Sequence, residues 1–175
     1  MFEFLQRVVA FLNAENIPYM LSGSVAMSVY IVPRATKDMD IIVHLEMQDV
    51  ERLTNHFSQG YYYERESIRE AVKTKGMFNI IDHASGFKAD FIILKNSEFR
   101  QTEFRRRQKV DFFGTPIYIV SVEDLLLSKL IWIQELQSGI QIQDIEHLLQ
   151  LETLDKKYIR HWIRELNLNT FNLQI

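Results

Sequence analysis

Apolar positions along the first part of the chain recur at spacings of three and four, which is typical of amphipathic helices. A period of two replaces this pattern from residue 77, and helical spacing returns from residue 121 to near the end. Helices are predicted over 2–14, 24–31, 46–58, 97–108, 121–136, 141–151 and 155–166. Strands are predicted over 19–21, 39–45, 77–82, 87–94, 109–113 and 116–120. Residues 61–75 fit either a helix or a loop.

The order of these elements predicts the fold class. Strands mixed with helices come first and helices alone come last, which favours an α+β fold with a mixed sheet and flanking helices. Residues 87–94 and 109–120 are expected in antiparallel hairpins, the first of them with residues 77–82. We therefore expect an α+β core over 1–120, with a C-terminal helical subdomain over 121–175 packed on it.

Composition excludes several classes of protein. The chain has 175 residues, of which 47% are hydrophobic and 25% are charged, so it is not intrinsically disordered. Cysteine is absent, which rules out a disulfide framework and a cysteine-ligated zinc site. A net charge of -3 argues against uniform coating by nucleic acid but leaves room for a local basic patch. No apolar run approaches the roughly 20 residues of a membrane span and no secretory pattern opens the chain, so we expect a cytoplasmic protein without a membrane partner.

The first candidate site lies at Gly23-Ser24, where a predicted strand runs directly into a predicted helix. The first N–H groups of a helix lack partners within the helix, and such termini bind anions. Glycine lets a phosphate approach the backbone closely, and the Ser24 hydroxyl adds a donor. The alternative interpretation is structural, with Ser24 as an ordinary N-cap and Gly23 filling a tight turn.

The second candidate is the pair Asp38 and Asp40, at the start of a predicted strand. Because strand side chains alternate, both carboxylates share one face and the apolar residues between and after them take the other. Two carboxylates on one face repel each other unless a cation or protons intervene. Oxygen ligands of this kind suit a hard divalent cation, Mg²⁺ above all.

The third candidate is Asp90, a single carboxylate near the start of the apolar strand 87–94. A buried carboxylate is costly without a partner. Lys88 or a nearby arginine would be an ordinary ion-pair partner. If this strand lies beside the strand of Asp40, however, three carboxylates converge, and such a cluster can hold two metal ions.

Together these motifs resemble the polymerase-beta-like nucleotidyltransferase superfamily, which has Gly-Ser at a strand-to-helix turn, Asp-x-Asp about fifteen residues later and a third Asp in a later strand. The resemblance is strongest to the small bacterial nucleotidyltransferases related to abortive-infection and toxin–antitoxin systems. Residues 34–43 (RATKDMDIIV) resemble that family's basic-x-Thr-x-Asp-x-Asp stretch, and residues 121–130 (SVEDLLLSKL) resemble its Glu-Asp-Leu…Lys-Leu segment. Asp144 falls where a further aspartate usually follows, although residues 139–143 lack the basic side chains often found there. The resemblance covers roughly residues 18–150.

The resemblance implies a role for each motif. Gly23 and Ser24 would hold the phosphates of a nucleoside triphosphate (NTP), Asp38 and Asp40 would bind Mg²⁺, and Asp90 would complete the site for two metal ions or act as general base. The reaction implied is attack of an acceptor hydroxyl on the NTP α-phosphate, with release of pyrophosphate. The acceptor could be RNA, a protein or a small molecule, and a protein partner is possible.

Lys129 and the start of its helix add two further predictions. Lys129 lies in a helix that is apolar on nearly every face, so its ammonium needs water or a partner. A triphosphate or one of the aspartates would serve as that partner, and we assign Lys129 to nucleotide binding; snorkelling to the surface is the alternative. Ser121 and Asp124 have the spacing of a capping box, so Glu123 and Asp124 are expected to cap the helix and not to act in catalysis.

The segment 99–109 is strongly basic in a chain that is net acidic. It is either a solvated helix neutralised by acidic residues of 64–70 or 98–103, or an arginine-rich rim that guides an anionic acceptor or the triphosphate.

Two other functions remain open at this point. One is a weakly active or inactive nucleotide-binding or partner-binding module of a toxin–antitoxin type system. The other is an unrelated α+β binding protein, in which the three carboxylates would lie far apart.

Overall fold

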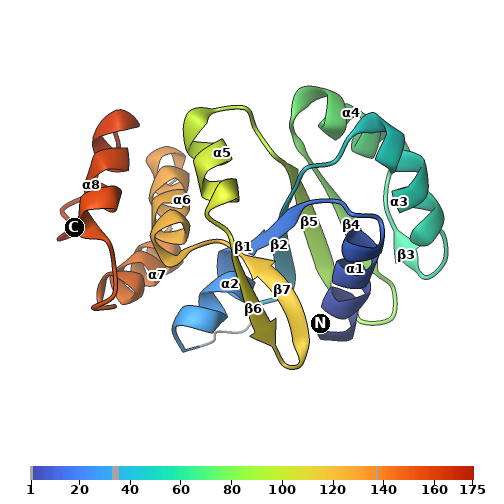
Figure 1. Cartoon of the computed structure of the whole chain (residues 1–175), viewed down its shortest axis with the longest axis horizontal. Coiled ribbons are helices and arrows are strands. Elements are labelled where there is room, and N and C mark those ends of the chain that lie inside the picture. The colour runs from blue at the N-terminus through green and yellow to red at the C-terminus, as the bar shows by residue number, and fades with distance from the viewer. Residues whose placement is uncertain (1, 33–35, 137) are drawn as a thin grey trace.

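A seven-stranded mixed sheet forms the centre of the molecule (Figure 1), and the computed structural model describes residues 2–32, 36–136 and 138–175. The strands lie in the order β3-β4-β5-β2-β1-β7-β6. Their bounds are β1 (Tyr19–Ser22), β2 (Asp38–Val43), β3 (Tyr61–Tyr62), β4 (Met77–Asp82), β5 (Lys88–Ile93), β6 (Gln108–Phe112) and β7 (Thr115–Ile119). Parallel pairs join β2 to β5 and β1 to β7, and the other neighbours are antiparallel.

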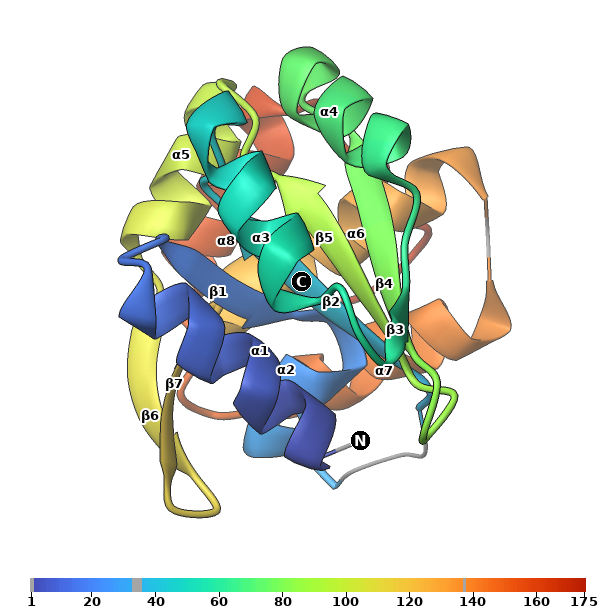
Figure 2. The same ribbon diagram turned by 90° about the vertical axis from the view of Figure 1, so that its right-hand side faces the viewer.

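Helices cover the two faces of the sheet. They are α1 (Phe2–Ala14), α2 (Gly23–Tyr30), α3 (Val50–His56), α4 (Arg65–Thr74), α5 (Glu98–Arg105), α6 (Val122–Glu135), α7 (Gly139–Leu149) and α8 (Lys156–Glu165), with a 3₁₀ turn η1 (Met47–Asp49) before α3. α1, α3 and α4 lie on one side of the strands, and α6, α7 and α8 lie on the other (Figures 1 and 2). α6 packs against α2, α7 and α8.

The predicted α+β class, with its mixed sheet and C-terminal helices, is confirmed. Both predicted hairpins form, as β4–β5 and β6–β7. The undecided segment 61–75 contains the short strand β3 and then α4. The division between a core and a subdomain at residue 120 stays a prediction.

Two predicted element boundaries differ from the structure, and nearby residues explain both differences. The β6–β7 turn is Phe113-Gly114, one residue earlier than expected, and both residues have positive φ, of 51° and 79°. A two-residue hairpin turn favours this backbone because it follows the twist of the strands. The predicted helix over 46–58 forms as η1 and a shorter α3, and Glu46 and Asp49 make a capping box at its start.

No helix over the described ranges combines the length and the apolar character needed to cross a bilayer.

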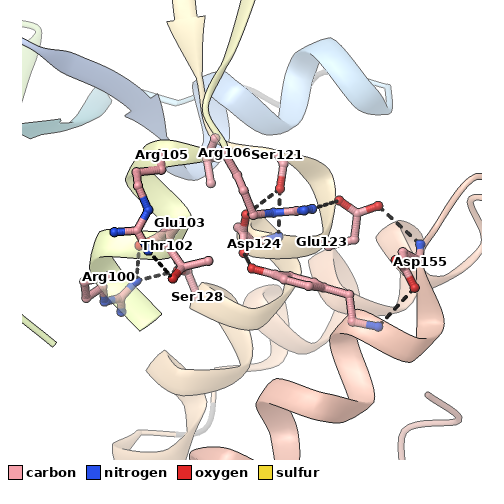
Figure 3. A network of polar contacts seen from close by, with 12 residues as sticks. Arg100, Thr102, Glu103, Arg105, Arg106, Ser121, Glu123, Asp124, Ser128 and Asp155 are labelled. Atoms are coloured by element: carbon pink, nitrogen blue, oxygen red, sulfur yellow. Dashed lines mark hydrogen bonds and ion pairs between the residues drawn. The ribbon is translucent and has the colours of Figure 1, made fainter. Parts of the chain in front are cut away.

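A polar network joins α5, α6 and α8 (Figure 3). Asp124, which is fully buried, accepts hydrogen bonds from Arg106 Nε at 2.9 Å and from the Tyr158 hydroxyl at 2.6 Å. Ser121 caps α6 as predicted, since its Oγ accepts the Asp124 backbone N–H. Glu123 contacts Arg106 Nη2 at 3.2 Å and accepts the backbone N–H of Asp155, at the start of α8. These contacts fix α6 against its neighbours.

Replacing Asp124 tests this network. Asp124→Ala leaves the Arg106 guanidinium and the Tyr158 hydroxyl without their partner, so the free energy of unfolding should fall by about 3 kcal/mol. Asp155→Ala removes a helix cap at the edge of the same network and should cost about 1 kcal/mol. Urea denaturation measures both losses. Equal, small losses would show that the network does not hold α6 in place.

Candidate active site

A row of polar side chains crosses four adjacent strands on one face of the sheet. The strand register places Ser22 opposite Asp40, Asp40 opposite Asp90, and Asp90 opposite Asn79. Directly opposed residues of neighbouring strands point to the same face, so these four side chains form one row. The predicted condition that the strand of Asp90 lies beside that of Asp40 is therefore met, and these two carboxylates do not lie far apart.

The other face of the same strands is apolar and closed. Met39, Ile41 and Ala89 are fully buried there, whereas Asp38 is exposed and Asp40 is half-buried. Strand alternation predicted this separation of the two faces, which aims the carboxylates away from the core.

Asp40 lies directly over Gly23. A Cβ added to Gly23 would come within 1.8 Å of Oδ2 of Asp40, and Gly23 has a φ of +58°. Both the space and the backbone conformation therefore require glycine at this position. The close approach brings the first turn of α2 against the carboxylate row.

Burial raises the pKa of Asp40, and the charge of Asp90 raises it further. Asp38 adds to this effect, while the ammonium groups of Lys129 and Lys88 lower the pKa and so partly offset it. The Asp40 carboxylate thus has an unfavourable environment for its ionised form in the protein alone.

Asp90 is 7% exposed and pairs with Lys88, whose Nζ lies 2.8 Å from Oδ2. The same ammonium lies 3.7 Å from Oδ1 of Asp38. The other oxygen of Asp90, Oδ1, is buried and has no hydrogen-bond partner among the described residues. The expected ion pair of Asp90 with Lys88 is therefore present, but it satisfies only one carboxylate oxygen.

Lys129 is buried and does not snorkel to the surface. Its Nζ lies 2.8 Å from Oδ2 of Asp144 and 2.9 Å from Oε1 of Gln141, both on α7. Its partner is thus an aspartate, but not one of the three predicted site carboxylates. The positive charge of Lys129 nevertheless lowers the pKa of Asp40. The assignment of Lys129 to nucleotide binding stays a prediction.

Ser24 is not the N-cap of α2, contrary to the structural alternative. The N-cap is Ser22, and its side chain makes no capping hydrogen bond. Helix α2 begins at Gly23, directly after the strand ends at Ser22, and Ser24 lies in the first turn. The N-terminus of α2 therefore opens beside Asp40 with Gly23 and Ser24 in its first turn.

The four arginines of the basic segment 99–109 make contacts with other groups of the chain. Arg106 binds Glu123 and Asp124, and Arg100 binds the buried Glu103. Arg107 donates to the Phe104 carbonyl and lies over the Phe104 ring, while Arg105 donates to Thr102. Glu103, from the acidic group 98–103, is thus one partner of this segment, as expected. Glu123 and Asp124 on α6 are further partners, although their sequence predicted only a capping role.

Several features of the site could not be assigned from sequence. Asn79 and Ser22 join the carboxylate row through strand pairing, and no local motif marks either of them. Arg34, the basic residue of the stretch 34–43, lies outside the described residues. Within the part of the chain that is described, no group of three or more acidic or histidine side chains is already arranged to hold a metal ion.

Gly23→Ala should damage both the fold and the site. The left-handed φ alone costs about 1–2 kcal/mol for a residue with a Cβ, and the new methyl group must displace the Asp40 carboxylate. Chemical denaturation should show at least that loss of stability. The control is Gly86→Ala, which also has positive φ but open space around it, so its loss should be the backbone term alone. An equal loss in the two variants would contradict the close approach.

The raised pKa of Asp40 predicts a pH dependence in the metal-free protein. Folding favours the protonated form, so stability should fall as pH rises from the ordinary Asp pKa, about 3.9, through the raised pKa of Asp40. Asp40→Asn removes this component and should be more stable than the wild type at neutral pH, with little difference near pH 3. Unfolding curves over this range measure it; a destabilised Asp40→Asn protein at pH 7 would contradict the prediction.

No family model matches the chain, and no curated protein sequence matches it. Several solved protein structures do match its fold. ANT(2″)-Ia, solved in complex with adenylyl-2″-tobramycin, is 13% identical with a TM-score of 0.67, covering 94% of this chain and 97% of its own. An antigenic nucleotidyltransferase-like protein from Paracoccidioides brasiliensis is 14% identical with a TM-score of 0.59, covering 94% and 85%. The lincosamide antibiotic adenylyltransferase LnuA, solved with lincomycin bound, is 15% identical with a TM-score of 0.55, covering 83% and 94%. At these identities the likeness establishes architecture: the chain has the fold of nucleotidyltransferases.

Proposed function

We propose that this protein is a divalent-cation-dependent nucleotidyltransferase, which moves a nucleotidyl group from an NTP to an acceptor hydroxyl and releases pyrophosphate. The observation that carries the proposal is the position of Asp40 and Asp90, side by side next to the N-terminus of α2. The fold shared with nucleotidyltransferases supports it.

The carboxylates suit a divalent cation, with Mg²⁺ as the first choice. Burial and like charge raise the pKa of Asp40, and Oδ1 of Asp90 is buried without a hydrogen-bond partner among the described residues. A cation bound to both would relieve each of these costs, and carboxylate oxygens are the ligands that Mg²⁺ prefers. Asp38 is on the same face and is the third ligand we propose, for one or two ions. Such ions would supply positive charge against the phosphate oxygens.

The remaining parts of the reaction are assigned to the chain's own groups. The N–H groups of the first turn of α2, with Gly23 and the Ser24 hydroxyl, would bind the triphosphate. As the acceptor oxygen bonds to the α-phosphorus, the bond to the pyrophosphate oxygen breaks. The hydroxyl proton then passes to a carboxylate oxygen of Asp90, which acts as general base. Lys129 would bind phosphate if its pair with Asp144 opens.

The class of acceptor is open among RNA, protein hydroxyls and small molecules. ANT(2″)-Ia was solved with an adenylylated antibiotic, and LnuA with an antibiotic bound. We propose small-molecule hydroxyls as the first acceptors to test.

One observation favours a second function, that of a weakly active nucleotide-binding or partner-binding module of the toxin–antitoxin type. Lys88 places a positive charge between Asp38 and Asp90, so an incoming metal ion must compete with it. In this case NTP would bind without efficient transfer, and a protein partner would be the functional target.

Thermal unfolding tests the proposed site. With Mg²⁺ and NTP at about ten times their dissociation constants, the melting temperature should rise by roughly 3–6 °C, because ligands bind only the folded state. The shift should vanish in Asp40→Asn/Asp90→Asn and persist in Glu70→Gln, a change of an exposed carboxylate on α4. Equal shifts in all three proteins would remove this site.

An α-labelled NTP then separates the two functions. Label that passes to an added acceptor, and that requires Asp90, identifies a transferase. Carboxylate-dependent melting shifts without transfer of label to any RNA, protein or small-molecule fraction would identify the binding module.

A further inference from the structure

Lys88 lies beside the row of polar side chains that contains Asp40 and Asp90, on the side of Asp38. The parallel register of β2 and β5 places it directly opposite Asp38, while it precedes Asp90 by two residues on the same face. Its ammonium therefore points into the space bounded by Asp38 and Asp90, at 3.7 Å from the first and 2.8 Å from the second.

The charge of Lys88 acts on all three proposed metal ligands. It pairs with Asp90, contacts Asp38, and lowers the pKa of Asp40. Without this ammonium, Asp38 and Asp90 would lose their ion-pair contacts, and the charge of Lys129 would be left to offset the repulsion at Asp40 among the lysines described. Lys88 thus does for the resting protein what a bound cation would do.

The Lys88 side chain is able to move away from the carboxylates. It is about one-third exposed, at 34%, and lysine carries its charge on a flexible four-carbon stem. The contact with Asp38 is long, and Asp90 uses only Oδ2 for Lys88, leaving Oδ1 for another ligand. A divalent ion that binds these oxygens would repel the ammonium and drive it toward solvent.

We infer that Lys88 is a built-in counter-cation: it holds the carboxylates together in the metal-free protein and is displaced when a divalent cation binds. It thereby sets the metal concentration at which the site fills. The inference rests on the proposed function, since it requires these carboxylates to be the metal ligands. It makes Lys88 a positioning residue and assigns it no contact with the reacting atoms.

Removing the ammonium should have two opposed effects. Lys88→Gln leaves the carboxylates uncompensated, so the metal-free protein should melt at a lower temperature. Competition also disappears, so titration with Mg²⁺ or Mn²⁺ alone should show tighter binding by roughly fivefold, the factor that one partly exposed ion pair can supply. Lys88→Arg keeps the charge and should stay near the wild type in both measurements. Lys95→Gln is the control for the loss of an exposed lysine.

The outcomes separate the inference from the proposed function. Metal binding that needs Asp40 and Asp90 but is equally tight or weaker in Lys88→Gln overturns the counter-cation and leaves the metal site intact. Metal binding that is absent from both the wild type and Lys88→Gln, or that is unchanged in Asp40→Asn/Asp90→Asn, overturns the proposed function and the inference with it.

A measurement on the wild type covers the case in which Lys88→Gln does not fold. Acetylation by an amine-reactive ester, read by mass spectrometry, should modify Lys88 slowly without metal and faster when Mn²⁺ is present. Lys95 should react at the same rate in both conditions. A Lys88 rate that does not rise under Mn²⁺ concentrations that saturate the site would overturn the displacement.

Discussion

Parallel pairing of β2 with β5 places the carboxylates of Asp40 and Asp90 in directly opposed positions, and the rest of the site follows from the repulsion between them. The apolar face behind the two strands keeps both side chains on the other side of the sheet, where burial raises the pKa of Asp40. Two like charges at one place need compensation. Lys88 supplies it from the same strand as Asp90, and Lys129 supplies it from α6.

Helix α6 connects this electrostatic requirement to the packing of the C-terminal helices. Its first turn carries Asp124, which binds Arg106 of the α5 region and Tyr158 of α8. Lys129 follows just over one turn later and is held by Asp144 of α7. The network that fixes α6 therefore also fixes the distance from the Lys129 ammonium to Asp40. A change at Asp124 should be felt at the carboxylate row through the position of one helix, without any contact between the two sites.

The sequence was informative where the determining pattern is local. Alternation along 38–45 was enough to place Asp38 and Asp40 on one face, because it depends on neighbouring residues. Helix spacing likewise predicted α1, α6, α7 and α8, but it left α4 undecided between helix and loop. Long-range pairing was not encoded in this way. Nothing near Lys129 in the sequence indicates that Asp144 is its partner, and Asn79 joins the row only because β4 pairs with β5. The N-cap of α2 was placed two residues late because Gly23 turns the chain with a positive φ immediately after the strand.

Two acidic pairs of this chain differ in how far groups of the chain itself compensate their charge. Glu123 and Asp124 are buried, and both carboxylates accept hydrogen bonds from the Arg106 guanidinium. Asp124 also accepts from the hydroxyls of Ser121 and Tyr158, and Glu123 from the backbone N–H of Asp155. Their negative charges are therefore compensated by groups of the chain itself. Asp90 is as buried as Glu123, but its Oδ1 has no hydrogen-bond partner among the described residues, and burial and like charge raise the pKa of Asp40. The second arrangement is unfavourable for negative charge, and a bound positive charge would relieve it.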